Sequence, residues 1–176
     1  MKNIVLTGFM GTGKSIVGER LAGKLGYRYC DMDALITERA GMSINQIFAL
    51  HGEVQFRDLE TEMIEEIAHK ERLVISTGGG AVLRDKNRKL LREKGVIINL
   101  VTSAEEIYSR ICSDSSRPLL KDDMSLPKIQ TMLKSRESYY ADADIRIDTT
   151  GKKVEDVVDE IVCRLEGIRG FEDSVG

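Results

Sequence analysis

A glycine-rich octapeptide near the start of the chain, GFMGTGKS at residues 8–15, restricts the fold more than any other segment. It fits the pattern G-x-x-x-x-G-K-[ST] in full. The apolar run at 3–7 precedes it, and the segment 14–25 that follows has apolar residues at helical spacing. A strand before the loop and a helix after it are the context that this pattern requires, and a chance glycine turn would not be expected to have both.

Glycines in such a loop let the backbone curl so that successive N–H groups point into one concavity and bind phosphate oxygens. The positive end of the following helix adds to this attraction. We expect Lys14 to reach the β- and γ-phosphates of a nucleoside triphosphate, and the Ser15 hydroxyl to ligate Mg²⁺. The other residues expected at the nucleotide from this segment are Gly11, Thr12, Gly13 and Ile16.

Two other classes of nucleotide-binding protein fit the sequence less well. A dinucleotide-binding loop would need a further glycine at position 16, where the chain has Ile16. A regulatory GTPase would need an N-K-x-D segment, which is absent, and a D-x-x-G segment after an apolar strand. The candidate strand 73–76 is followed instead by Thr77 and three consecutive glycines.

The rest of the chain alternates between short apolar runs and segments of helical periodicity, which predicts one α/β domain with a mostly parallel sheet covered on both faces. We expect further strands at 27–30, 73–76, 96–100 and 144–148. Helices are expected at 34–70, broken near Gly41 and Gly52, and at 85–93, 103–111, 126–141 and 154–165. Ser103 and Glu106 have the spacing of a capping box. The polar segment 112–124 is expected to form a lid, and the tail 168–176 to be frayed.

Composition excludes several kinds of partner. The chain has 176 residues, and 41% of them are hydrophobic, which suffices for one core. Its net charge of −3 argues against binding to nucleic acid or to a membrane surface, and no stretch is long and apolar enough to span a bilayer. The three cysteines are widely spaced, which indicates reduced thiols in a cytoplasmic protein rather than disulfides or zinc. The size permits a monomer.

Two acidic residues follow the second expected strand, in CDMDALI at 30–36. The carboxyl ends of parallel strands share one edge of the sheet, so Asp31 and Asp33 can face the nucleotide. On an extended segment they would point the same way, one near Mg²⁺ and the other accepting a proton from an incoming hydroxyl. Alternatively, Asp33 is the N-cap of the following helix, a role compatible with catalysis.

Arginines and a second glycine loop suggest an anionic acceptor. Arg57, Arg117 and Arg136 have the planar fork that suits a carboxylate or a phosphate, although most arginines are surface groups. The segment STGGGAV at 76–82 is either a flexible turn or a place where bare N–H groups approach a ligand. The residues alone thus indicate an ATP-dependent kinase for a small anionic hydroxyl compound.

Over residues 3–165 the chain resembles the shikimate kinase family. The matching segments, in order, are GFMGTGKS, CDMDALI, SINQIFALHGEVQFRDLE, STGGGAV, RPLL and the R-x-x-Y-Y stretch from Arg136. The resemblance implies a three-layer P-loop fold like that of nucleoside monophosphate kinases, with a five-stranded parallel sheet of order 2-3-1-4-5. It also implies transfer of the γ-phosphate of ATP to the 3-hydroxyl of shikimate, with Mg²⁺, in the chorismate and aromatic amino-acid pathway.

The resemblance assigns roles residue by residue. It implies that Asp33 is the base at the acceptor hydroxyl and that Asp31 lies near the magnesium. The remaining implied contacts are Arg57 and Arg136 on the shikimate carboxylate; Gly78, Gly79 and Gly80 at the substrate, with Gly79 the most direct; Arg117 on the phosphoryl group; and Arg110 stacked on adenine.

Two departures from the family pattern concern the nucleotide. Ile16 replaces the usual threonine, and the segment 149–153 lacks the asparagine or arginine often found around adenine. Neither position touches the residues expected at shikimate. Two alternatives stay open at this point: a related small-molecule kinase such as gluconate kinase, and a non-catalytic ATP-binding module, which would be expected to lose Asp33 or Arg117.

Overall fold

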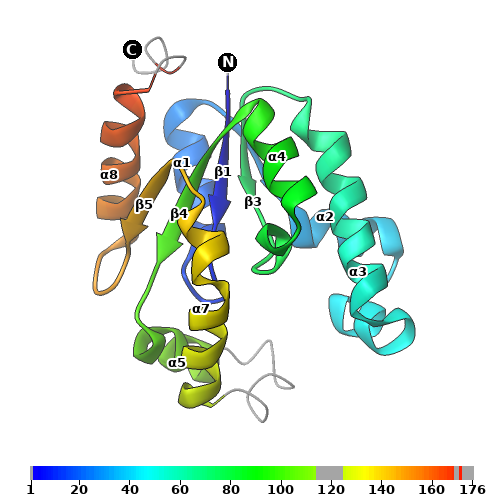
Figure 1. Ribbon diagram of the computed structural model, residues 1–176. Coiled ribbons are helices and arrows are strands. Elements are labelled where there is room, and N and C mark those ends of the chain that lie inside the picture. The colour runs from blue at the N-terminus through cyan, green and yellow to red at the C-terminus, as the bar shows by residue number, and fades with distance from the viewer. Residues whose placement is uncertain (1, 114–124, 169–170, 172–176) are drawn as a thin grey trace.

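Five parallel strands form one sheet in the order β2-β3-β1-β4-β5, as shown in the computed structural model (Figure 1). The structure describes residues 2–113, 125–168 and 171. The α/β class and the strand order predicted above are confirmed. The strands are β1 (Asn3–Thr7), β2 (Arg28–Asp31), β3 (Leu73–Ser76), β4 (Gly95–Val101) and β5 (Ile145–Asp148).

Helices cover both faces of the sheet. One face packs against α1 (Lys14–Leu25) and α8 (Val154–Glu166), and the other against α2 (Met32–Ala40), α3 (Ile44–Ala68) and α4 (Asp85–Glu93). A short 3₁₀ helix, η1 (Ala81–Leu83), precedes α4. The helices α5 (Ala104–Ser113) and α7 (Leu126–Ala141) lie at the end of the sheet where the strands terminate (Figure 1).

The central strands are buried on both sides because alternate side chains enter different cores. On β1, Ile4 and Leu6 pack with α1 and α8, whereas Val5 packs with α2, α3 and α4. A third, smaller cluster lies beyond the strand ends and joins the P-loop to α5 and α7. Its buried members are Phe9, Val82, Ile107, Ile111, Ile129 and Tyr140.

The expected helix breaks are confirmed, and each has a glycine in a conformation that other residues rarely adopt. Gly41 has φ 64° and ends α2. Gly52 has φ 78° and ψ 173°, which kinks α3. The capping box expected at Ser103 is only half formed. The Glu106 N–H donates to Ser103 Oγ at 3.2 Å, but the Glu106 carboxylate turns away to Arg110 and Gly151.

The expected lid at 112–124 lies outside the described residues, except that Cys112 and Ser113 belong to α5. Most of the tail lies outside them as well. Phe171, however, is buried against α8 and the sheet, so the expected fraying is wrong at this residue. Within the described ranges, no helix has the length and hydropathy needed to cross a membrane.

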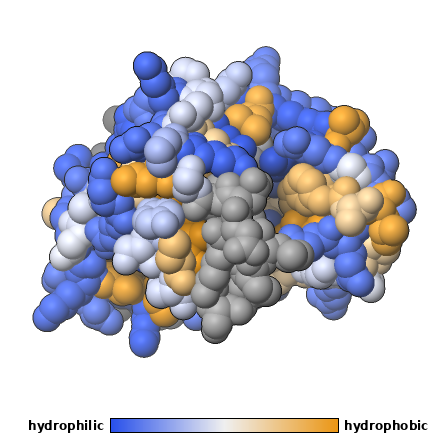
Figure 2. All heavy atoms as spheres, turned by 90° about the horizontal axis from the view of Figure 1, so that it is seen from below, coloured by the Kyte–Doolittle hydropathy of each residue, from blue (hydrophilic) through white to orange (hydrophobic). Residues whose placement is uncertain are grey.

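Figure 2 views the end of the molecule where the strands terminate. Apolar side chains gather on its right side, over the first half of α3. Phe48, Leu50 and Val54 are exposed there, and the Phe48 ring packs on Phe56 with 4.7 Å between ring centroids.

Candidate active site

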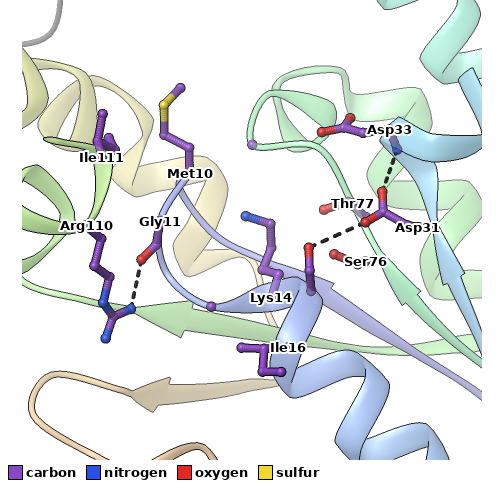
Figure 3. A pocket seen from close by; sticks show the side chains of 13 residues that line it. Met10, Gly11, Lys14, Ile16, Asp31, Asp33, Ser76, Thr77, Arg110 and Ile111 are labelled. Atoms are coloured by element: carbon purple, nitrogen blue, oxygen red, sulfur yellow. Dashed lines mark hydrogen bonds between the residues drawn. The ribbon is translucent and has the colours of Figure 1, made fainter. Parts of the chain in front are cut away.

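A cavity of about 330 Å³ lies at the carboxyl ends of β1, β2 and β3. We call it the P-loop cavity. Parallel strands place their last residues at one edge of the sheet, which brings the P-loop, the acidic pair and the second glycine loop together. Figure 3 shows Arg110 on one side, the acidic pair on the other and Lys14 between them. The cavity is lined by Met10, Gly11, Gly13, Lys14, Ser15, Ile16, Asp31, Asp33, Ser76, Thr77, Gly79, Arg110 and Ile111.

The P-loop has the conformation that its glycines permit. Gly8 has φ 145°, and a β-carbon there would lie 2.5 Å from the carbonyl oxygen of Leu100. Gly13 has φ 93° and leads into α1. Lys14 is 9% exposed, and its Nζ donates to the carbonyl oxygens of Gly8 and Phe9, each at 2.9 Å. The ammonium group is therefore held beside the concavity where phosphate is expected.

Thr12 is buried, and its hydroxyl donates to the Phe9 carbonyl at 2.8 Å. Its backbone N–H donates to the same carbonyl at 3.3 Å, and its own carbonyl accepts the Thr149 hydroxyl at 3.4 Å. Thr12 therefore stabilises the loop.

Asp31, not Asp33, is the N-cap of α2. Its Oδ1 accepts the N–H groups of Asp33 at 2.9 Å and Ala34 at 3.2 Å. The expectation that both carboxylates sit on one extended segment is wrong, because α2 begins at Met32 and Asp33 lies in its first turn. The capping alternative for Asp33 is wrong for the same reason.

The second oxygen of Asp31 faces the P-loop. Asp31 Oδ2 lies 3.4 Å from Ser15 Oγ and accepts the Tyr29 hydroxyl at 3.2 Å. Burial raises the pKa of Tyr29 to about 12, so this hydroxyl remains a donor at neutral pH.

A hydroxyl and a carboxylate oxygen at this place fit Mg²⁺, which keeps several waters and binds through one or two protein oxygens plus phosphates. The described residues contain no cluster of three or more His, Cys, Asp or Glu side chains suited to a metal. Phosphate and water oxygens would therefore have to complete the coordination of an ion held by Ser15 and Asp31.

Arg57 is fixed by a buried carboxylate that the sequence analysis missed. Its side chain is 14% exposed, and its Nη1 donates to Glu60 Oε2 at 2.5 Å. Glu60 is fully buried, and burial raises the pKa of its carboxyl although the Arg57 charge opposes this. Arg57 Nε and Glu60 Oε1 have no hydrogen-bond partner among the described residues. The i, i+3 spacing on a helix was the signal that could have revealed this pair.

The glycines after β3 provide space rather than an unusual backbone conformation, since none of them has a φ in the left-handed region. A β-carbon on Gly78 would lie 2.7 Å from Glu60 Oε1 and 3.0 Å from Asp33 Oδ1. One on Gly80 would lie 2.2 Å from Arg57 Nη2. The second glycine loop thus lets Asp33, Glu60 and Arg57 come close to the main chain.

Tyr140 connects this loop to α7 and was also missed. Its hydroxyl donates to the Gly79 carbonyl at 2.6 Å, and burial raises its pKa against the charges of Arg136 and Arg57. Arg136 lies with its guanidinium carbon 5.7 Å from the centre of the Phe9 ring. The two arginines expected to share a carboxylate therefore both lie near Tyr140, beside the P-loop cavity, while Arg117 lies outside the described residues.

A second cavity, of about 300 Å³, lies on the other side of the P-loop. Arg110 and Ile16 border both cavities, and Ile16 is 43% exposed. Arg110 Nη1 donates to the Gly11 carbonyl at 2.8 Å, which holds the guanidinium across the P-loop. The remaining lining residues of the second cavity are Gly11, Thr12, Gly13, Val17, Thr149, Lys152, Val154 and Val157.

Comparison with known proteins identifies the family. Residues 10–166 match the family model described as "Shikimate kinase". A shikimate kinase of Geobacter metallireducens is 58% identical over 95% of this chain and 93% of its own length. The solved structure of a shikimate kinase from Acinetobacter baumannii in complex with shikimate has 34% identity and a TM-score of 0.90, covering 97% of this chain and 96% of that one.

The gluconate kinase alternative is much weaker. A gluconokinase structure from Sinorhizobium meliloti has 20% identity and a TM-score of 0.63, which indicates a shared fold alone. The family model, the high identity and the near-complete coverage of both chains agree with one another. This chain therefore belongs to the shikimate kinase family.

Proposed function

We propose that this chain transfers the γ-phosphoryl group of ATP to the 3-hydroxyl group of shikimate, with the residues of the P-loop cavity arranged for that transfer. Membership of the family makes the chain an ATP-dependent phosphotransferase with shikimate kinase activity. The observation that carries the assignment of roles is that Lys14 and Asp33 line the same cavity. One supplies positive charge for the phosphates, and the other a carboxylate for the acceptor hydroxyl.

On the donor side, the backbone N–H groups of the P-loop and Lys14 bind the phosphates. The ammonium group neutralises charge on the phosphoryl group as it moves. Mg²⁺, held by Ser15 and Asp31, would supply further positive charge to the phosphate oxygens. Support for this pair comes from the approach of Ser15 Oγ to Asp31 Oδ2.

On the acceptor side, Arg57 and Arg136 bind the shikimate carboxylate, and Asp33 orients the 3-hydroxyl and accepts its proton. The bond between this hydroxyl oxygen and the γ-phosphorus forms in line with the bond that breaks to ADP. Asp31 makes the helix cap, so this assignment does not require Asp33 to cap α2 as well. The role of Arg117 on the transferring group rests on the family resemblance alone.

Gly79 is the most direct contact of the second glycine loop with the acceptor. It is the glycine of that loop that lines the P-loop cavity, and a β-carbon there would have no neighbour closer than 3.5 Å. The loop therefore leaves room at this position for a cyclic substrate.

A coupled assay of ADP release tests the proposal. We expect turnover with shikimate, and none with gluconate, nucleoside monophosphates or no acceptor. Lys14→Met should remove nearly all activity. Turnover independent of an acceptor, or no turnover at all, would instead favour a hydrolase or a non-catalytic ATP-binding module.

We propose further that the chain acts as a monomer in the cytoplasm. The chain is long enough to form one core of its own, and the three cysteines are free thiols, as expected in a reducing compartment. Light scattering on the purified protein tests the oligomeric state. The mass of a dimer at micromolar concentration would overturn the proposal of a monomer.

A further inference from the structure

The carboxylate of Glu106 connects two walls of the second cavity. One oxygen, Oε1, forms an ion pair with Arg110 Nη2, one helical turn away on α5. The other, Oε2, accepts the backbone N–H of Gly151 at 3.0 Å. Gly151 lies in the turn between β5 and α8 and has φ 68°. Both acceptor positions of this side chain are therefore in use, and each binds a different element.

These contacts extend to the P-loop. Arg110 donates from its other terminal nitrogen to the Gly11 carbonyl at 2.8 Å. The P-loop, α5 and the β5–α8 turn are thus joined through one arginine and one glutamate. Each of these elements contributes to the lining of the second cavity.

Other hydrogen bonds hold the β5–α8 turn in place, but they do not orient Arg110. Thr149 Oγ1 lies 2.6 Å from Thr102 Oγ1, and both side chains are buried. The Ser103 N–H donates to Thr150 Oγ1 at 3.0 Å. The turn is therefore anchored to the connection between β4 and α5 whether or not Glu106 is present. The direction of the Arg110 guanidinium depends on Glu106 and on the Gly11 carbonyl.

We infer that Glu106 is a positioning residue for the nucleotide base: it holds Arg110 at the border of the second cavity, with its planar face available to a purine ring. The inference rests on the role of Arg110 at adenine that the family resemblance implies, which we include in the proposed function. The apolar lining from Val17, Val154 and Val157 suits a flat base, and a guanidinium stacks on such a ring. Without its carboxylate partner, Arg110 could turn into the P-loop cavity, which it also borders.

The chemistry of position 106 requires a carboxylate. In a glutamine, an NH₂ group takes the place of one carboxylate oxygen and would face a donor there, either Arg110 or the Gly151 N–H. Glu106→Gln should therefore lose one of the two bonds with almost no change in volume. Glu105 is the matched control, because it is exposed on the same helix and takes part in none of these contacts.

The test measures KM for ATP and for shikimate, and the ratio of kcat/KM for ATP to that for CTP. For Glu106→Gln and Glu106→Ala we expect KM for ATP to rise about 5–10-fold, the size of a stacking interaction, with KM for shikimate changed less than about 2-fold. The preference for ATP over CTP should narrow by a similar factor, because a pyrimidine presents less ring to the guanidinium. Glu105→Gln should change none of these values.

Arg110→Ala and the double variant Arg110→Ala/Glu106→Gln separate the inference from the proposed function. If both act through one contact with the base, the double variant should be no worse than Arg110→Ala alone. If Arg110→Ala leaves KM for ATP unchanged, the assignment of Arg110 to the nucleotide is wrong. If Arg110→Ala raises KM for ATP and Glu106→Gln does not, only the role of Glu106 is overturned. If Glu106→Gln raises KM for ATP and KM for shikimate equally and lowers the Tm, the role of Glu106 is purely structural and the inference is wrong.

Discussion

The guanidinium group of Arg57 fills the space that a side chain at Gly80 would need, since a β-carbon there would lie 2.2 Å from Arg57 Nη2. The absence of a side chain at Gly80 thus leaves room for the Arg57 guanidinium, which pairs with Glu60 through Nη1. The second glycine loop brings protein charges close to the main chain as well as leaving room for a ligand.

Gly80→Ala should therefore act through Arg57. The methyl group must displace the guanidinium from its pair with Glu60, and we expect KM for shikimate to rise about 10-fold or more, equivalent to about 1.4 kcal/mol. KM for ATP should stay within about 2-fold. Steady-state kinetics with each substrate varied in turn measure both effects.

Two alanine variants serve as references for Gly80→Ala. Gly23, on α1, has no neighbouring atom within 4 Å of an added β-carbon, so Gly23→Ala should leave both KM values unchanged. Gly79→Ala should keep its Tm and still weaken shikimate binding, since no atom lies within 3.4 Å of the added carbon. Equal rises in the two KM values for Gly80→Ala would contradict the displacement of Arg57.

Asp33→Asn should lower kcat at least about 100-fold, because the acceptor hydroxyl loses its base. KM for ATP and the free energy of unfolding should change little, since Asp31 makes the cap of α2. Asp31→Ala should instead destabilise the protein by about 1 kcal/mol. Single-turnover kinetics and urea denaturation measure the two quantities separately. Near-normal kcat in Asp33→Asn would exclude its role as base.

Tyr140→Phe should reveal how much the glycine loop depends on α7. The variant removes the hydrogen bond of 2.6 Å that the Gly79 carbonyl accepts from the Tyr140 hydroxyl. This loss should lower the free energy of unfolding by about 1–2 kcal/mol. We also expect KM for shikimate to rise about 3–10-fold, because Gly79 loses its fixed position. Tyr139→Phe is the control, because the Tyr139 ring is 36% exposed and a phenylalanine ring would keep its contact with Arg88. Equal stability in the two variants would show that this hydrogen bond contributes nothing.

Glu60 should impose a pH dependence on stability. Burial raises its pKa from 4.5 in the folded protein, so the folded state binds the proton more tightly than the unfolded chain. The contribution of Glu60 to stability is then largest below pH 4.5 and decreases as the pH rises through the raised pKa. The unfolding free energy of the wild type minus that of Glu60→Gln should accordingly fall as the pH rises above 4.5. Denaturation at a series of pH values tests this. A rise of this difference with pH would refute the sign.

The sequence predicted the strands and the strand–loop–helix context of the P-loop well because both depend on local patterns. Strand periodicity and the spacing of Gly8, Gly13 and Lys14 are encoded within a few residues. The fold class was confirmed, and so was the strand order, which the family resemblance implied and no local pattern encodes. Strand bounds shifted by one residue at β2, at β4 and at the start of β5, because backbone pairing, not side-chain pattern, ends a strand.

The acceptor side was harder to predict because burial and distant contacts are not encoded locally. The Tyr140 hydroxyl contacts Gly79, 61 residues away in the sequence. Glu60 lies only three residues from Arg57, but its sequence context gives no sign that its carboxylate is buried. That Asp31 rather than Asp33 caps α2 depended on where the helix begins, and a sequence pattern places helix starts only to within a residue or two.

Phe9 serves the two halves of the site by different means. Its carbonyl oxygen accepts from Lys14 and Thr12, whereas its ring lies beneath the Arg136 guanidinium. Every amino acid has that carbonyl, and the P-loop pattern leaves position 9 free. Evolution can therefore exchange the ring, and with it the surroundings of Arg136, while the lysine keeps its backbone partner. The loop that is most constrained in sequence thus contains one position at which acceptor preference can drift without loss of the donor site.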